Sequence, residues 1–192
     1  MSAPPGSAAR REWAFKRTRR RCAAAAGNKL IEAMLENAGQ PKLGLIGNGP
    51  EYSMFESLLI NTALYVESED GWIFSSPQNT DEGIYHAWKA IEGFCRSAKD
   101  APKNVSLLYD ELEAPPYGAK KVIILVLLLS VLLYHNEYVS VYIDETFIPV
   151  LGPEHFELLV KKPERFAVKY FEIMEVKVEV LTQVYQIFCD NQ

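Results

Sequence analysis

The feature that most constrains this chain is a run of 13 apolar residues from Val122 to Tyr134, in which Ser130 is the one clearly polar side chain. Lysines precede the run at 120 and 121. A membrane-spanning helix needs about 20 apolar residues to cross roughly 30 Å of hydrocarbon, whereas 13 helical residues rise only about 20 Å. The run is therefore too short to span a bilayer. Since a helix that is apolar all round is usually the buried centre of a globular protein, we expect this one to form the core.

The segments around the run predict a winged-helix-like unit over residues 104–150. A short helix is expected at 105–112 with Asn104 as its N-cap, and Pro-Pro-Tyr-Gly at 115–118 predicts a turn before the apolar helix. After that helix, the sequence YVSVYIDETFIPVL alternates about Asp144 and Glu145 in the manner of a β-hairpin. The order of helix, turn, helix and hairpin is that of a winged helix.

The apolar helix is poorly suited to DNA recognition, although winged helices often bind DNA through the helix before the wing. Contacts to bases and phosphates come mainly from Arg, Lys, Asn, Gln, Ser and Thr side chains, and this helix offers Ser130 and two lysines at its start. Asp144 and Glu145 at the hairpin tip would repel phosphate. Both features favour a winged helix that packs against protein.

The whole chain is predicted to be an α+β protein, mainly helical, with a winged-helix-like unit, a β-hairpin wing and an N-terminal helical subdomain. Its 48% hydrophobic and 23% charged residues are typical of a globular protein. We expect a flexible basic arm at 1–22, a helical subdomain with a short strand at 23–100, and a winged-helix-like subdomain at 104–192. Three widely separated cysteines without a CxxC pair, and no apolar leader, favour a cytoplasmic location.

Local signals place the other elements. Apolar spacing predicts helices at 22–38 and 84–95, and the capping-box spacing of Ser53 and Glu56 predicts a helix that continues to Val66. The stretches GWIFSSP and ERFAVKYFEI predict strands, and Gly152-Pro153 predicts the start of another helix. A last helix is expected where apolar residues recur at helical spacing, although EVKVEV also alternates: Met174, Val178, Leu181, Tyr185 and Phe188.

Positive charge is concentrated at the N-terminus. Residues 1–29 hold eight Lys or Arg against Glu12, a balance of +7, so the remainder carries −12. Arginines mixed with aromatic residues suit phosphate contact combined with base stacking, or a targeting signal. The simpler alternatives are a disordered solvated tail or a stretch that is not native to the fold. The candidate nucleic-acid-binding residues are Arg10, Arg11, Trp13, Phe15, Lys16, Arg17, Arg19, Arg20 and Arg21.

No motif predicts catalysis, a cofactor or a metal site. The glycines from Gly44 to Gly49 are followed by Pro and Glu, whereas a P-loop needs Lys and Ser or Thr there. His86, His135 and His155 are isolated and form no HxxxH pair. We therefore expect a non-enzymatic interaction or regulatory domain that binds a partner protein, with nucleic-acid binding by the arm and the winged helix as the alternative.

Several stretches resemble segments in the non-ATPase portion of very large bacterial P-loop ATPases of the phage-defence and bacteriophage-exclusion type. These stretches are AAAAGNKLIEAMLENAGQPKLGL, GPEYSMFESLL, LYDELEAPPYGAKK and LGPEHFELLVKKPERFAVKYFEI, and the resemblance covers roughly residues 23–190. It implies an accessory region of an ATP-dependent machine that acts on or near DNA. The Walker lysine motif is missing and the first 22 residues depart from the family pattern. We therefore expect a fragment or degenerate copy that packs against an ATPase core.

Overall fold

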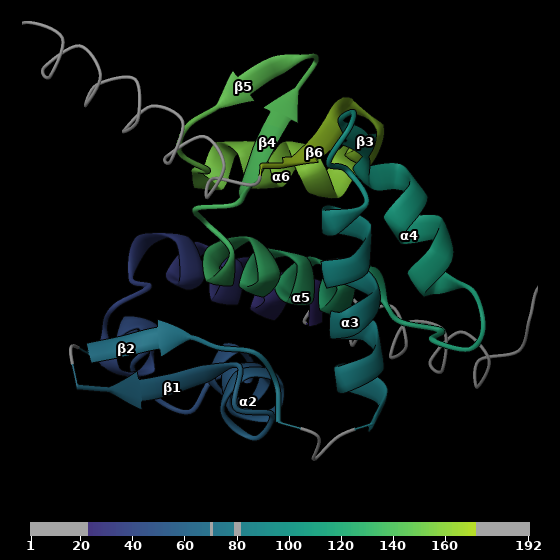
Figure 1. Ribbon diagram of the computed structural model, residues 1–192. Helices are drawn as coiled ribbons and strands as arrows, with labels where there is room; N and C mark the ends of the chain where they lie inside the picture. The colour runs from purple at the N-terminus through teal and green to yellow at the C-terminus, as the bar shows by residue number, and fades with distance from the viewer. Residues whose placement is uncertain (1–22, 70, 79–81, 172–192) are drawn as a thin grey trace, which may run out of the picture.

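The computed structural model describes residues 23–69, 71–78 and 82–171 of the chain. These residues are mainly helical and also form two small antiparallel sheets (Figure 1). The predicted α+β, mainly helical class is confirmed. Residues 23–36 are helical, and the elements that follow are η1 (Pro41–Gly44), α2 (Pro50–Phe55), η2 (Glu56–Ile60), β1 (Tyr65–Ser68), β2 (Gly71–Phe74), α3 (Glu82–Arg96), β3 (Lys103–Asn104), α4 (Val105–Glu113), α5 (Lys121–Tyr134), β4 (Val139–Ile143), β5 (Thr146–Ile148), α6 (Pro153–Lys161), η3 (Pro163–Arg165) and β6 (Phe166–Tyr170).

The apolar run forms α5, which lies in the middle of the molecule between the helix at 23–36 and the four-stranded sheet (Figure 1). Its residues from Ile124 to Leu132 are all buried, as predicted from a helix without a polar face. The Ser130 hydroxyl donates to the Val126 carbonyl oxygen at 2.8 Å, so this buried polar group is satisfied within the helix. None of the helices in the described ranges is long and apolar enough to cross a membrane.

The helix at 23–36 approaches α5 closely at Gly27. A Cβ atom at this position would lie 2.1 Å from Cγ2 of Val122, far inside van der Waals contact. Glycine therefore allows the two helices to pack at short range here, and a larger residue would push them apart.

The larger sheet has the strand order β3-β6-β4-β5, with every pair antiparallel. Val139, Val141 and Ile143 of β4 are buried, and the residues between them are less buried, so one face of the sheet covers the core. The hairpin of β4 and β5 turns at Asp144 and Glu145, as predicted, and both residues have positive φ, of 47° and 66°. Such backbone suits the tight hairpin turns that match strand twist.

The smaller sheet pairs β1 with β2 and contributes an aromatic cluster to the core. Tyr65 packs against Phe55, Trp72 and Phe74, with ring centroids 4.9 to 6.2 Å apart. Its hydroxyl lies 2.7 and 2.8 Å from the carbonyl oxygens of residues 38 and 40 and donates to them. This side chain therefore ties the hairpin to the loop that follows the first helix.

Most local predictions are confirmed, including the cap of α4: the Asn104 side chain accepts from the Ser106 amide at 2.8 Å. The predicted strands form β2 and β6, and α6 begins at Pro153. The helix predicted at 174–188, like the arm at 1–22, lies outside the described residues.

The prediction of a capping box at Ser53 and Glu56 is wrong. The helix begins one turn earlier, at Pro50, and the Ser53 amide already donates to the Gly49 carbonyl oxygen at 3.1 Å. Proline at the first helical position needs no amide partner, which favours this start. The predicted continuation of the helix to Val66 is also wrong, because Ala63 has a φ of 58° and the chain then pairs as β1.

Candidate functional site

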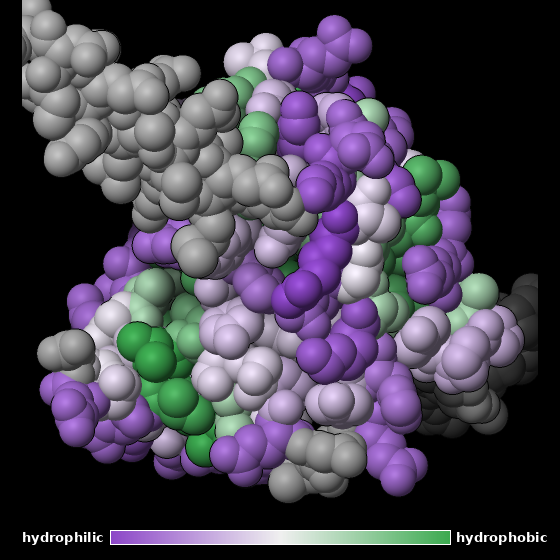
Figure 2. Space-filling view, viewed as in Figure 1, coloured by the Kyte–Doolittle hydropathy of each residue, from purple (hydrophilic) through white to green (hydrophobic). Residues whose placement is uncertain are grey.

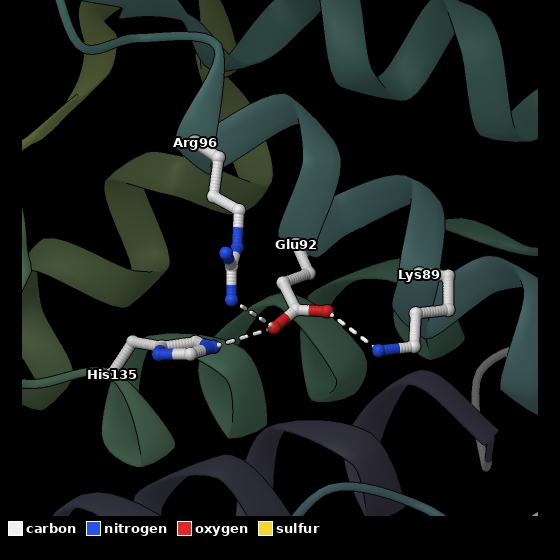
Figure 3. Close-up of polar contacts among 4 residues, drawn as sticks. All are labelled: Lys89, Glu92, Arg96 and His135. Carbon is white, nitrogen blue, oxygen red and sulfur yellow. Dashed lines mark hydrogen bonds and ion pairs between the residues drawn. The ribbon is translucent and has the colours of Figure 1, made fainter.

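The nine residues predicted to contact nucleic acid all precede residue 23 and lie outside the described part of the chain. They are Arg10, Arg11, Trp13, Phe15, Lys16, Arg17, Arg19, Arg20 and Arg21. The candidate site within the described residues is instead a cluster of charged side chains around Glu92, here called the Glu92 cluster: Lys89, Glu92, Arg96 and His135 (Figure 3).

Helix α3 brings three members of the cluster together. Positions 89, 92 and 96 are three and four residues apart, so their side chains project from one face of the helix. One Glu92 oxygen accepts from the Lys89 ammonium at 2.9 Å, and the other accepts from the Arg96 guanidinium at 3.1 Å (Figure 3). Figure 2 shows the hydrophilic surface that runs along this helix.

The fourth member comes from the end of α5. Nε2 of His135 lies 3.2 Å from the Glu92 oxygen that also accepts from Arg96. The rings of Tyr134 and Tyr138 contact the imidazole edge-on, with centroids 4.6 and 6.4 Å away. The Glu92 and His135 side chains are each 12% exposed, so the contact between α3 and α5 is largely shielded from water.

Burial pushes the pKa of Glu92 upward, but the hydrogen bonds from Lys89 and Arg96 outweigh burial and hold this pKa below its ordinary value. The hydrogen bond to Glu92 raises the pKa of Lys89 in turn. The carboxylate is therefore ionised at neutral pH, with both oxygens engaged by cationic donors. A carboxylate held in this way accepts a proton poorly, which disfavours a role as a general base.

Cys95, which also lies on α3, is 1% exposed. Burial, with a smaller contribution from the Glu92 charge, raises the pKa of this thiol to about 12. Because the thiolate is the nucleophilic form, Cys95 is unreactive at neutral pH. Among the described residues, no group of three or more His, Cys, Asp or Glu side chains is placed to hold a metal ion. The arrangement around Glu92 is that of a structural ion-pair network joining two helices.

A second charged contact closes the β4–β5 turn. Nε of Arg165 lies 3.0 and 2.9 Å from the two Asp144 oxygens, and its NH2 group contacts the same carboxylate. The hydrogen bond from Arg165 holds the pKa of Asp144 below its usual range. The sequence predicts an acidic hairpin tip at Asp144 and Glu145. In the fold, Asp144 is paired with Arg165, which lies 21 residues later.

Two open grooves lie beside these elements, here called the docking grooves. One has a volume of about 340 Å³ between the helix at 23–36 and α6, and its lining includes Ile31, Glu32, Phe156, Glu157 and Val160. The other has about 330 Å³ between the end of α5 and the β4–β5 hairpin, and its lining includes Leu35, Leu133, Asn136, Phe147 and Val150. Val150 is 76% exposed and Val160 is 41% exposed. Both grooves thus present apolar side chains to solvent.

Sequence reasoning missed the Glu92 cluster as a unit. The spacing of Lys89, Glu92 and Arg96 on a predicted helix is the signal that could have found three of its members. Nothing in the sequence connects them to His135, which lies 43 residues after Glu92. The fold alone brings that imidazole to α3.

Comparison of the chain with protein-family models, with curated proteins and with solved structures finds no match. The resemblance to accessory regions of large bacterial P-loop ATPases therefore stays a prediction.

Proposed function

We propose that this chain is a non-catalytic interaction domain that binds a partner protein, such as an ATPase core, through the docking grooves. The proposal rests on one observation: apolar side chains in the core are buried, whereas apolar side chains at the docking grooves are exposed. The most apolar helix, α5, is buried, whereas Val150 and Val160 stand open to solvent at the grooves. Exposed apolar side chains that gather in a patch are typical of interaction sites.

The charge around the grooves supports a partner of particular chemistry. Glu32 lines one groove, where Glu157 is paired with Lys161 at 3.3 Å, and the exposed residues Glu36 and Glu137 directly follow lining residues of the other. Complementary charge guides protein association and suppresses wrong partners. The partner surface is therefore proposed to present apolar side chains flanked by Lys or Arg.

We further propose a winged-helix-like unit that runs from α3 to β6 and so extends the unit predicted at 104–150 in both directions. The order α3, β3, α4, α5 and β4 supports this, as does the pairing of β3 with β6 and of β6 with β4. In this arrangement β5 and α6 are an insertion between the two paired strands β4 and β6. Because α5 precedes β4 and is buried, the unit is proposed to serve as a scaffold for protein contact and not as a DNA reader.

Position-specific photo-crosslinking tests the proposal. A photoreactive phenylalanine analogue is placed at Val150, at Val160 and, as the control, at Leu107, which is 57% exposed on α4. The same partner should cross-link at the two groove positions and not at the control. With that partner purified, V150D/V160D should weaken binding at least tenfold while L107D leaves it unchanged.

Two results would count against this function. Unchanged affinity of V150D/V160D for the cross-linked partner would remove the grooves from the interface. Hydrolysis of ATP by the purified chain above that of a mock preparation would contradict a non-catalytic role.

Nucleic-acid binding by the arm is a second candidate, supported by the excess of arginine in residues 10–21. An anisotropy titration with single-stranded DNA at two salt concentrations tests it, because contacts to phosphate weaken steeply as salt rises. Deletion of residues 1–21 should abolish that binding, and full affinity after the deletion would exclude the arm.

A further inference from the structure

The β1–β2 hairpin is apolar on its outer face as well as on its inner one. The inner face carries Tyr65 and Phe74, which pair across the strands and are buried in the core. Strand alternation places the next pair, Val66 and Ile73, on the opposite face. Ile73 is 49% exposed there, although the solvated face of an antiparallel sheet usually carries polar side chains. Figure 2 shows the hydrophobic surface that results across this hairpin.

The segment before the hairpin adds a third exposed apolar side chain, Ile60, which is 36% exposed. Ile60 ends η2, a π-helical turn that packs against β1 and in which the Asn61 amide donates to the Glu56 carbonyl oxygen at 2.9 Å. Ala63 follows with a φ of 58°. Both π-helical turns and non-glycine residues with positive φ recur at functional sites. The three outward side chains are here called the apolar row: Ile60, Val66 and Ile73.

The surroundings of the apolar row are acidic. Residues 43–88 hold seven Asp or Glu and no Lys or Arg. Glu56 precedes Ile60 on η2, and Glu67 and Glu69 lie on β1 and directly after it; all three carboxylates are exposed. Among the described residues, no Lys or Arg forms an ion pair with any of the three. A second copy would bring like charges to this surface, whereas a cationic partner would complement it.

The backbone of the hairpin favours a helix over a strand as the occupant. The Ser75 amide donates to the Leu64 carbonyl oxygen at 2.9 Å, so the alternation of an antiparallel ladder directs the backbone groups of Tyr65 and Phe74 toward the two outer edges. Tyr65 is 1% exposed and Phe74 is 8% exposed, so both edges are covered at this level. An added strand would find no open edge there, whereas a helix can lie on the outer face and bury the apolar row.

We propose that the apolar row is a docking site for an amphipathic helix of a partner protein, with Lys or Arg beside its apolar stripe. The row shares no residue with the docking grooves. Its hairpin lies at the opposite end of the molecule from the β4–β5 hairpin, with α5 between them (Figure 1). This site goes beyond the proposed function, because a chain with two separate surfaces can join two proteins.

Peptide selection on the full-length chain tests the proposal. A phage-displayed library of random peptides of about 16 residues, long enough for four helical turns, is selected on the wild-type protein. The enriched peptides should combine apolar residues at helical spacing with Lys or Arg. In an anisotropy titration, these peptides should bind I73D about tenfold more weakly than wild type. L107D, which places the same charge at an exposed leucine of α4, should bind them as wild type does.

Charge reversal gives an independent measurement that leaves the apolar row intact. E67K should weaken binding of the same peptides about threefold, and this loss should shrink as salt rises, because it is electrostatic. E111K, at an exposed carboxylate of α4, is the matched control and should leave binding unchanged. The midpoint of urea unfolding, measured for every variant, separates lost binding from lost folding.

Three outcomes overturn the proposal. Enriched peptides without Lys or Arg would exclude the acidic surroundings from recognition. Peptides that bind I73D and E67K as tightly as wild type, or a selection that enriches no peptide, would exclude the apolar row as a docking site. A wild-type chain that sediments as a dimer, together with I73D that sediments as a monomer, would make a second copy the occupant.

Discussion

Helices α3 and α5 pack against each other, but their positions follow from different features of the chain. Helix α5 is apolar on every side, and its position follows from that composition alone. Helix α3 buries Trp88, Ile91 and Cys95 on one side and presents Lys89, Glu92 and Arg96 on the other. Its outward charges find a partner, His135, only because α5 ends beside them. The comparison teaches that burial here is encoded locally, whereas polar contacts between helices depend on the finished fold.

The largest expected effect on stability comes from a substitution in the buried helix α5. Leu128→Ala removes a fully buried side chain from the centre of the core. We expect a loss of about 3 kcal/mol in the free energy of unfolding, from lost burial and the cavity that remains. Urea denaturation measures it, with Leu107→Ala on the exposed side of α4 as the control, expected to change stability by less than about 0.5 kcal/mol. Equal effects of the two variants would show that α5 is not the core.

Glu92→Gln tests the polar contact between α3 and α5, because it keeps the shape of the side chain and removes its charge. Lys89 and Arg96 keep a largely solvated position, since their side chains are 48% and 59% exposed, so we expect a loss of about 1 to 2 kcal/mol at pH 7. Glu111→Gln, an exposed carboxylate on α4, is the control.

The difference in stability between wild type and Glu92→Gln should depend on pH. The pKa of Glu92 is lowered by folding from its ordinary value of 4.5, so its stabilising effect is complete above that value and is lost as the pH falls through the folded pKa. The difference in stability between wild type and Glu92→Gln should therefore shrink in acid below pH 4.5. A difference that grows in acid would have the wrong sign.

A smaller effect is expected at Tyr65, where burial raises the pKa of the hydroxyl to about 12. Tyr65→Phe removes the hydrogen bonds to the carbonyl oxygens of residues 38 and 40, with an expected cost of about 1 kcal/mol in thermal or urea unfolding. Tyr134→Phe, whose parent side chain is 42% exposed, should be neutral. Since the raised pKa favours the protonated hydroxyl, the stabilisation should be present below pH 10 and fall as the pH rises further.

The smallest effect should come from Asp144→Asn at the exposed hairpin turn. The Arg165 contact is open to solvent, and exposed ion pairs contribute little after screening by salt. The midpoint of urea unfolding should be indistinguishable from wild type at physiological salt. A clear shift would mean that the turn contact stabilises the sheet in a way that its exposure does not suggest.

Sequence patterns predicted the elements whose signals are local. The apolar run, the Asn104 cap, the turn at Asp144 and Glu145 and the proline start of α6 all depend on residues within a few positions of one another. The pattern around Ser53 misled because two helix starts competed, and Pro50 was the stronger of the two.

Long-range contacts could not be predicted in the same way. The pairing of β6 between β3 and β4, the Glu92–His135 contact and the Asp144–Arg165 pair join residues from 21 to more than 60 positions apart. Each depends on the backbone route that the core imposes. The docking grooves belong to this class too, since their walls come from the first helix, α5, α6 and the hairpin.

The central claim is that α5 is the buried scaffold of a protein-contacting domain and does not read nucleic acid. Native-state hydrogen exchange of residues 121–134, measured by mass spectrometry with and without double-stranded DNA, tests it most directly. We predict that these amides are among the slowest in the protein to exchange, at the free energy of global unfolding, and that DNA leaves their exchange unchanged. Fast exchange in the free chain, or new protection of this helix when DNA is added, would contradict the claim.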